Sequence, residues 1–473
     1  MSKTQTIYTS ADLLVQPYAF EHVLDMELHK QPGEHATFRI RGVISEKNLD
    51  QYVERADEDE LIEVRLKDED TNVPLFQGMV TDISVRAVNG VRELTIEAVS
   101  ATFRMDIEKR RRSFQNTGQS YSQLFTHVTS AYGGAEVVDT ASGGAAVGEL
   151  VVQYLETDWA FIKRVASRLH APLLPISMQP GLKYVIGVPD LGAPVQLDEH
   201  NYRIQKNLEQ YKKLSSNGVS GYQENNALSY EVTSHAVLEL GSAVVFRQRQ
   251  LYVAEVRTHL EGQLVVSRYV LRDAEGLKCP ASYAFGLSGV SLLGKVKQVA
   301  KDQVQISLDI DRGSSAAGAM WFPYSTVYSS PDGSGWYVMP ENGDQVRLYF
   351  PDEVEQHAFV ASSVDLSSSD PVKRGDPSVK SISTKYGKQL VFTPGAVEVI
   401  SNDKLLMRLT DEGGIEIISD KKIVLKAEED IEITSNQGNV LIEGQSGVSF
   451  IQSGAELNIL DDVTFKGGRV NIE

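Results

Sequence analysis

The sequence has 473 residues, of which 64 are acidic and 46 are basic, and its formal net charge is −18. This length predicts about three domains at roughly 100–200 residues each. The negative charge argues against a nucleic-acid partner, because phosphate recognition needs a basic surface. The single cysteine, Cys279, excludes an internal disulfide and a cysteine-based metal cluster.

The first ten residues, MSKTQTIYTS, contain no apolar stretch of the kind found in signal peptides. No run in the sequence approaches the roughly 18 apolar residues of a membrane-spanning helix. We therefore expect the chain to be made in the cytoplasm and to leave it, if at all, by an unconventional route or as part of a larger particle.

Residues 17–105 contain several short runs in which apolar and polar side chains alternate, which is typical of antiparallel strands. Val88-Asn89-Gly90-Val91 predicts a tight hairpin, since Asn-Gly accepts the positive φ angles of a type I′ turn. The basic run from Lys109 to Arg112 is predicted to be a solvated face.

Two helices are expected after these strands. Leu124, Phe125 and Val128 share one apolar face in the first, and Gly133-Gly134 can end it. Thr157 is the expected N-cap of the second, with Asp158 in its first turn. Strand-like sequence then resumes from about residue 184 to residue 271.

Residues 285–365 hold five further strand-like runs, within the length of a small five-stranded barrel. The Ser-, Asp- and Pro-rich stretch DLSSSDPVKRGDPSVK follows, and it predicts a linker over residues 366–388.

The last segment, residues 389–473, repeats a pair of apolar residues two positions apart, every eight or nine residues. The clearest pairs are Ile415/Ile417, Ile423/Leu425, Ile431/Ile433, Val440/Ile442, Val448/Phe450 and Leu457/Ile459. Residues two apart in a strand point the same way, so each pair faces one interior. A three-faced coil made by one chain needs about 18 residues. Eight residues supply only one face of a layer. The simplest source of the other two faces is two more copies of the same chain. We expect an intertwined trimeric β-prism, because a plain antiparallel meander fits the regular octads poorly.

Val470 and Ile472 form the last apolar pair of the sequence, and no histidine follows His357 that could organise a metal there. Three copies would leave a small apolar platform and open strand edges at this end, which invite a cover. We therefore expect a separate cap protein on residues of about 463–473.

Three stretches resemble those of the spike proteins of contractile injection systems. One stretch carries Gln153, Tyr154, Glu156, Thr157, Asp158, Phe161 and Ile162; another carries Trp336, Pro340, Gly343 and Asp344; the third carries Phe76, Gln77, Gly78 and Val80. On these residues the chain is similar over nearly its whole length to VgrG, to phage baseplate hub-and-needle proteins and to the late control D family.

The resemblance implies a mainly β protein in four parts. Residues 1–280 would form a hub of two β-barrel-like subdomains with helical insertions, and residues 285–365 an OB-fold that includes Trp336, Pro340, Gly343 and Asp344. Residues 366–388 would link this to a triple-stranded β-helix spike over residues 389–473. The implied assembly is a homotrimer in an extracellular particle or phage tail. Its implied partners are an inner tube protein bound by the hub, other baseplate proteins, a PAAR-type tip protein and the target cell envelope.

We expect no catalytic, cofactor-binding or metal-binding residues. Gly289 to Val296 nearly spells a phosphate-binding loop, but Val296 replaces the required hydroxyl residue. Glu156 and Asp158 lie near His170 in the sequence and could suggest a hydrolase, yet helix capping explains Asp158 more simply.

The leading interpretation is a mechanical spike in a phage-tail-like particle or tailocin. A type VI secretion spike, a hub with peptidoglycan-hydrolase activity and a receptor-binding fibre are the alternatives. The short rod and the lack of a fused effector favour the phage-tail-like particle, and a fibre would need a globular head after the stalk.

Overall fold

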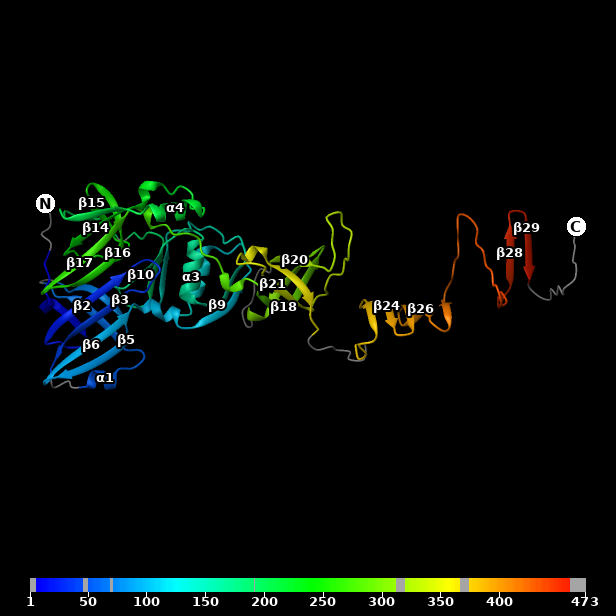
Figure 1. Cartoon of the computed structure of the whole chain (residues 1–473), viewed down its shortest axis with the longest axis horizontal. Helices are drawn as coiled ribbons and strands as arrows, with labels where there is room; N and C mark the ends of the chain where they lie inside the picture. Colours follow the sequence, from blue (N-terminus) through cyan, green and yellow to red (C-terminus); the bar gives the residue numbers. More distant parts are fainter. Residues whose placement is uncertain are drawn as a thin grey trace. The chain divides into compact units, whose positions relative to one another are not determined.

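The structure is a computed structural model that describes residues 6–45, 50–68, 71–190, 192–311, 320–365 and 374–459 (Figure 1). It is mainly β, as the sequence predicts. The chain divides into two compact units, residues 1–366 and residues 367–473, and each is described by itself.

A 12-stranded sheet is the largest part of the first unit. Its strands follow the order β1-β4-β5-β6-β3-β2-β16-β17-β14-β13, with β15 beside β16 and β12 beside β15. Neighbouring strands are antiparallel except for β12 and β15. The strands are β1 (Leu13–Gln16), β2 (His22–Lys30), β3 (Thr37–Ile44), β4 (Leu61–Leu66), β5 (Val73–Val88), β6 (Val91–Val99), β12 (Val195–Leu197), β13 (Tyr202–Lys206), β14 (Leu228–Ser234), β15 (Ala243–Phe246), β16 (Arg249–Glu261) and β17 (Leu264–Arg272).

This sheet has two halves, each with its own hydrophobic core. Phe38 and Ile96 belong to the core of the β1–β6 half, and Phe246 and Tyr269 belong to that of the β12–β17 half. The halves are joined where β2 pairs with β16. The two similar barrels that the family resemblance implies stay a prediction.

The predicted hairpin between β5 and β6 is confirmed. Val88 lies opposite Val91, and the two turn residues have positive φ angles, 51° at Asn89 and 80° at Gly90. The Asn-Gly pair therefore allows the tight reversal that its sequence predicts.

A helical insertion separates the two halves of the sheet in the sequence. It contains a two-stranded sheet of β7 (Lys109–Phe114) and β9 (Val151–Thr157), and a three-stranded sheet of β8 (Glu136–Asp139), β10 (Leu173–Ile176) and β11 (Lys183–Ile186). Both predicted helices are present, as α2 (Tyr121–Thr129) and α3 (Asp158–Ser167), and Thr157 caps α3 by accepting from the Ala160 N–H at 3.2 Å.

The remaining helices of the first unit are short. Two are α-helical, α1 (Gln51–Arg55) and α4 (Leu208–Ser216). The 3₁₀ turns are η1 (Ser10–Asp12), η2 (Ala101–Asp106), η3 (Glu224–Ala227), η4 (Glu275–Leu277), η5 (Phe285–Leu287), η6 (Asp309–Asp311) and η7 (Glu355–His357).

The five-stranded barrel expected over residues 285–365 is confirmed. It is closed in the order β18-β19-β20-β22-β21 by β18 (Ser291–Ala300), β19 (Gln303–Leu308), β20 (Trp321–Ser325), β21 (Gln345–Tyr349) and β22 (Phe359–Ser363). β18 pairs with both β19 and β21, and β20 runs parallel to β22. Val304, Phe322 and Val360 are among its buried core residues.

The second unit contains an antiparallel meander of β23 (Lys380–Ser383), β24 (Lys388–Thr393), β25 (Ala396–Ser401), β26 (Lys404–Thr410) and β27 (Gly414–Ile417). A hairpin of β28 (Val448–Gln452) and β29 (Ala455–Ile459) follows later. The expectation that the octads do not form a plain antiparallel meander is therefore wrong for these segments of the single chain. Positive φ angles at Asn402 and Asp403 make a tight turn there without glycine. β23 also lies inside the stretch that the sequence predicts as a linker.

Gly78 in β5 sits against the neighbouring backbone. A Cβ atom on it would lie 2.2 Å from the Val99 carbonyl oxygen and 2.6 Å from Phe76 Cζ. This close approach explains why the family-like stretch around Phe76 and Gln77 carries a glycine.

We predict that Gly78→Ala lowers the free energy of unfolding by about 1–3 kcal/mol, the usual cost of overpacking a tight site. Urea unfolding followed by circular dichroism measures this. Gly133→Ala is the matched control, because nothing lies within 4 Å of its Cβ position. Equal stability of the two variants would contradict the packing argument.

Candidate assembly sites

The family-like segment from Gln153 to Ile162 lies where the helical insertion meets the small barrel. Phe161 and Ile162 of α3 are buried in the core of the insertion. Leu150 and Val152, at the start of β9, pack instead into the core of the barrel. One strand and the helix that follows it therefore belong to two adjoining cores.

Asp158 is fully buried and forms the centre of a polar cluster in this segment. Its carboxylate accepts from Gln153 Nε2 and from the Tyr132 hydroxyl, each at 2.9 Å. It also pairs with Arg112, and with Arg110 at 3.4 Å. Burial lowers the pKa of Arg112, although the charge of Asp158 opposes the effect.

The basic run from Lys109 to Arg112 is therefore only partly the solvated face that the sequence predicts. Two of its arginines turn toward Asp158, and a third, Arg111, lies over the ring of Tyr154 at 5.5 Å. Lys109 and Arg111 are exposed as predicted. For Arg110 and Arg112 the prediction was wrong, because a buried carboxylate 46 residues beyond Arg112 has no signal in a local charge pattern.

A second cluster connects α3 directly to the barrel through Glu355 of η7. Arg164 donates to Glu355 at 2.8 Å, and it also binds both oxygens of Glu156, at 2.8 and 2.7 Å. Arg168 donates to the other oxygen of Glu355 at 2.8 Å. The side chains of Arg164 and Glu355 are only 3% and 4% exposed. A charge pair buried this deeply holds the two parts in one geometry, because separating it would leave unpaired charge in the interior.

A third contact lies on the other side of β7. The Ser113 N–H and hydroxyl donate to the two oxygens of Asp311 in η6, at 2.6 and 2.5 Å. Burial raises the pKa of Asp311, and the two hydrogen bonds oppose that effect. Together with Glu355, Asp311 fixes the barrel to the insertion at two places.

These contacts leave little room for acid–base chemistry at Glu156 and Asp158. Both carboxylates are bound by arginines, and His170 Nδ1 lies 3.0 Å from the Cys279 carbonyl oxygen. Burial raises the pKa of the Cys279 thiol to about 11, so this cysteine is poorly suited to act as a nucleophile.

The family-like residues of the barrel fall in the connection between β20 and β21. The Gly343 N–H donates to the Val296 carbonyl at 2.8 Å, and the Val296 N–H donates to the Asp344 carbonyl at 2.9 Å. Pro340 is buried. Trp336 lies outside the barrel strands and is 55% exposed.

The rod-core residues predicted in the second unit lie in three settings. Ile415 and Ile417 are in β27, and Val448, Phe450, Leu457 and Ile459 are in the hairpin of β28 and β29. The middle six lie between these elements, where the structure has no strand across the described residues 418–447. They are Ile423, Leu425, Ile431, Ile433, Val440 and Ile442, and their exposed fractions run from 50% to 69%. Val470 and Ile472 lie outside the described residues.

The meander also leaves an apolar face uncovered. In register, Val397 lies opposite Leu409 and Leu409 opposite Ile415, so these side chains share one face. Leu409 and Ile415 are exposed on it. The other face carries the ion pair of Glu398 with Arg408, at 2.7 Å.

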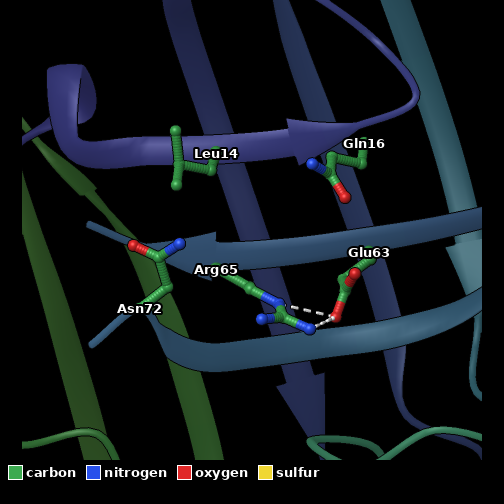
Figure 2. Close-up of a pocket in the computed structure, with 5 residues that line it drawn as sticks. All are labelled: Leu14, Gln16, Glu63, Arg65 and Asn72. Atoms are coloured by element: carbon green, nitrogen blue, oxygen red, sulfur yellow. Dashed lines mark hydrogen bonds and ion pairs between the residues drawn. The ribbon is translucent and has the colours of Figure 1, made fainter. Parts of the chain in front are cut away.

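A small pocket of about 130 Å³ lies beside β1 and β4 (Figure 2). Leu14, Gln16, Glu63, Arg65 and Asn72 line it. Figure 2 shows Arg65 directed at Glu63, with its Nε atom 2.6 Å from the carboxylate, and Gln77 also donates to Glu63 at 2.7 Å. The charged groups that line the pocket therefore pair with one another. The pocket is also smaller than the roughly 300–1,000 Å³ of typical ligand sites.

In the part of the chain that the structure describes, no group of His, Cys, Asp and Glu side chains could hold a metal ion. Within the same residues, no helix has the length and apolar character needed to cross a membrane.

Residues 56–168 match the model of the family described as phage tail baseplate hub (GPD). Over this segment the chain is similar to the baseplate hub family. The hub segment runs from just before β4 to the end of α3, so it contains both Gly78 and the Asp158 cluster. The resemblance to this family that the sequence indicates is confirmed. None of the curated proteins compared with the chain matches it.

Solved structures share the fold at low sequence identity. The E. coli c3393 protein, a component of the type VI secretion system with structural similarity to the T4 tail proteins gp27 and gp5, matches with a TM-score of 0.53. It has 11% identity, and the match covers 75% of this chain and 99% of that one. A chain of the half-lidded Francisella PdpA–VgrG complex matches with a TM-score of 0.56 and 10% identity, covering 88% and 89%. At these identities the comparison shows the fold alone.

Sequence reasoning missed Glu355 and Asp311, the two barrel residues that hold the hub segment. Each is a single carboxylate in a short turn, 187 to 198 residues away from its partners in α3, Arg168 and β7. No local pattern marks such a residue, and only the fold brings it to the arginines or to Ser113.

We predict that Glu355→Gln lowers the free energy of unfolding by on the order of 3 kcal/mol, because it leaves buried arginine charge without its partner. Glu136→Gln is the control, since its pair with Lys183 at 3.1 Å lies at the surface and should contribute less than about 1 kcal/mol. Urea unfolding compares the two. A loss at Glu355 no larger than at Glu136 would contradict the role of the buried cluster.

Proposed function

We propose that the chain is the central hub and spike of a contractile, phage-tail-like injection system, in which it joins the inner tube to a needle that punctures the target cell envelope. The single observation that carries this proposal is the pairing of a hub-family segment with a C-terminal unit whose apolar side chains lie uncovered in one chain.

Assembly of three copies accounts for the second unit. Among the described hydrogen bonds, none between backbone groups joins residues 419–447 to another part of the chain. Backbone that lacks ladder partners in its own chain and bears apolar pairs every eight or nine residues is what a rod completed by other chains requires. The exposed apolar face of the meander supports the same assembly, because three such faces can close on a common axis.

The remaining parts have assigned places in this proposal. The hub over residues 1–280 would bind the inner tube and baseplate proteins. The barrel over residues 285–365 would act as an OB-fold collar above the rod of residues 389–473, and its closed five-strand order supports that assignment. A PAAR-type protein would bind near Val470 and Ile472.

The buried charge clusters suit a mechanical role. A spike must pass an axial force from its hub to its rod without the parts shearing. Glu355 and Asp311 hold the barrel to the hub segment through contacts that are costly to break. No catalytic group is needed for this function.

A type VI secretion spike is the second candidate, favoured by the fold shared with the c3393 protein. The neighbouring genes distinguish the two, since sheath and lysis genes indicate a phage-tail-like particle and a membrane-complex locus indicates type VI secretion. A hub with peptidoglycan-hydrolase activity is the third, and lysis of purified peptidoglycan by the protein would replace the purely mechanical account.

We predict a trimer in solution. Each buried Val, Leu or Ile side chain contributes about 1.5–3 kcal/mol, so some ten layers of contacts would hold three copies together at any ordinary concentration. Light scattering should give three times the chain mass of 52.2 kDa. A particle of one chain mass would refute the proposal.

We also predict that Ile431→Asp prevents assembly of the rod, because it places three carboxylates near one axis, where like charges without partners are costly. Glu432→Lys is the matched control, because in a strand of the proposed rod the residue next to Ile431 would point outward. Light scattering of both variants measures the effect. Trimers from both, or from neither, would show that the inward and outward positions are assigned wrongly.

A further inference from the structure

An aromatic hairpin projects from the barrel between β20 and β21. We call residues 326–339 the aromatic arm. Figure 1 shows the arm standing away from the barrel strands after β20. Its large apolar side chains are strongly exposed, with Val327 at 86%, Trp336 at 55% and Tyr337 at 74%.

The arm is held in one conformation by its own hydrogen bonds. The Trp336 N–H donates to the Tyr328 carbonyl at 2.9 Å, and the Thr326 hydroxyl donates to the Trp336 carbonyl at 2.8 Å. At the tip, Asp332 accepts from the Ser334 N–H at 2.9 Å and from its hydroxyl at 2.7 Å. A preformed hairpin loses little conformational entropy when it binds a partner.

Two further features tie the arm to its position. The Tyr337 hydroxyl donates to the Lys301 carbonyl at 2.8 Å, at the turn between β18 and β19. Gly335 has a φ angle of 134°, and a Cβ atom there would lie 2.4 Å from the Tyr328 carbonyl oxygen. Only glycine allows the two sides of the arm to approach so closely.

The chemistry of the arm indicates a protein partner. Exposed tryptophan and tyrosine on a rigid support are typical anchors of protein interfaces. Nucleic acid can also stack on aromatic residues, but such sites combine them with a basic groove. The arm contains no lysine or arginine, and its one charged residue, Asp332, is acidic.

The connection between the two units indicates which protein that partner is. Only residues 366–373 separate the last described residue of the first unit from the first described residue of the second. A chain covers no more than about 3.6 Å per residue, so a segment of this length can reach at most roughly 30 Å. Copies joined through the second unit must therefore keep their barrels close together, at a high effective concentration.

We propose that the aromatic arm of one copy packs against a neighbouring copy in the trimer, with Trp336 and Tyr337 as its anchors. This inference rests on the proposed function, because it uses the trimer that the second unit requires. It adds a contact between copies at the level of the barrel, outside the rod.

The test uses the full-length protein and the fluorescence of Trp336. Acrylamide quenching is measured on the wild type and on Trp336→Phe, and the difference isolates the contribution of Trp336 from those of Trp159 and Trp321. We expect quenching of Trp336 in the native trimer to be severalfold weaker than in the protein unfolded by guanidinium. In parallel, p-benzoylphenylalanine in place of Tyr337 should give a light-dependent cross-link between two chains.

The outcomes separate this inference from the proposed function. A particle of trimer mass in which Trp336 is quenched as freely as in the unfolded chain overturns the arm contact and leaves the spike intact. Cross-links confined to one chain overturn it in the same way. A particle of one chain mass overturns both.

Discussion

An apolar face presented every eight or nine residues cannot be buried by the chain that carries it. Most side chains from Ile415 to Leu457 that the octads direct inward are exposed in the single chain, and no described hydrogen bond between backbone groups joins residues 419–447 to another part of it. In a water-exposed monomer this would be an aggregation hazard. Covered by two further copies, the same residues become a narrow core along one axis. The proposed rod depends on this burial of its apolar side chains by two further copies.

A rod of this kind is useful only if force reaches it. In the proposed spike, the first unit would meet this need with buried charge instead of apolar packing alone. Glu355 receives Arg164 and Arg168 from α3, and Asp311 receives Ser113 from β7. Buried ion pairs are weak contributors to net stability, but they are specific, because any sliding of the barrel would separate charges in a low-dielectric interior. They suit a joint that must keep its geometry under load.

Much of this organisation could be predicted from the sequence because its signals are local. The Asn89-Gly90 hairpin, the Thr157 cap of α3, the five-stranded barrel and the octad pairs all follow from patterns within a few residues. The hub family was likewise indicated by short stretches such as Gln153 to Ile162. Each of these features can be derived without knowing what lies elsewhere in the chain.

The features that could not be predicted depend on distant contacts. The role of Glu355 needs the fold to bring η7 to α3, and the turning of Arg110 and Arg112 toward Asp158 needs the pairing of β7 with β9. The meander was missed for another reason. Its strands have the same period as the octads, so alternation alone cannot say whether consecutive strands pair with each other or with other copies. The turn at Asn402-Asp403 decides this for β25 and β26.

Backbone hydrogen exchange over residues 419–447 of the full-length protein tests the central claim most directly. If other copies complete the rod, the amides of this segment pair with neighbouring chains, and their exchange should be slowed to the level of the strands in the barrel core. Exchange at the rate of an unstructured peptide, while the barrel core stays protected, would contradict the account.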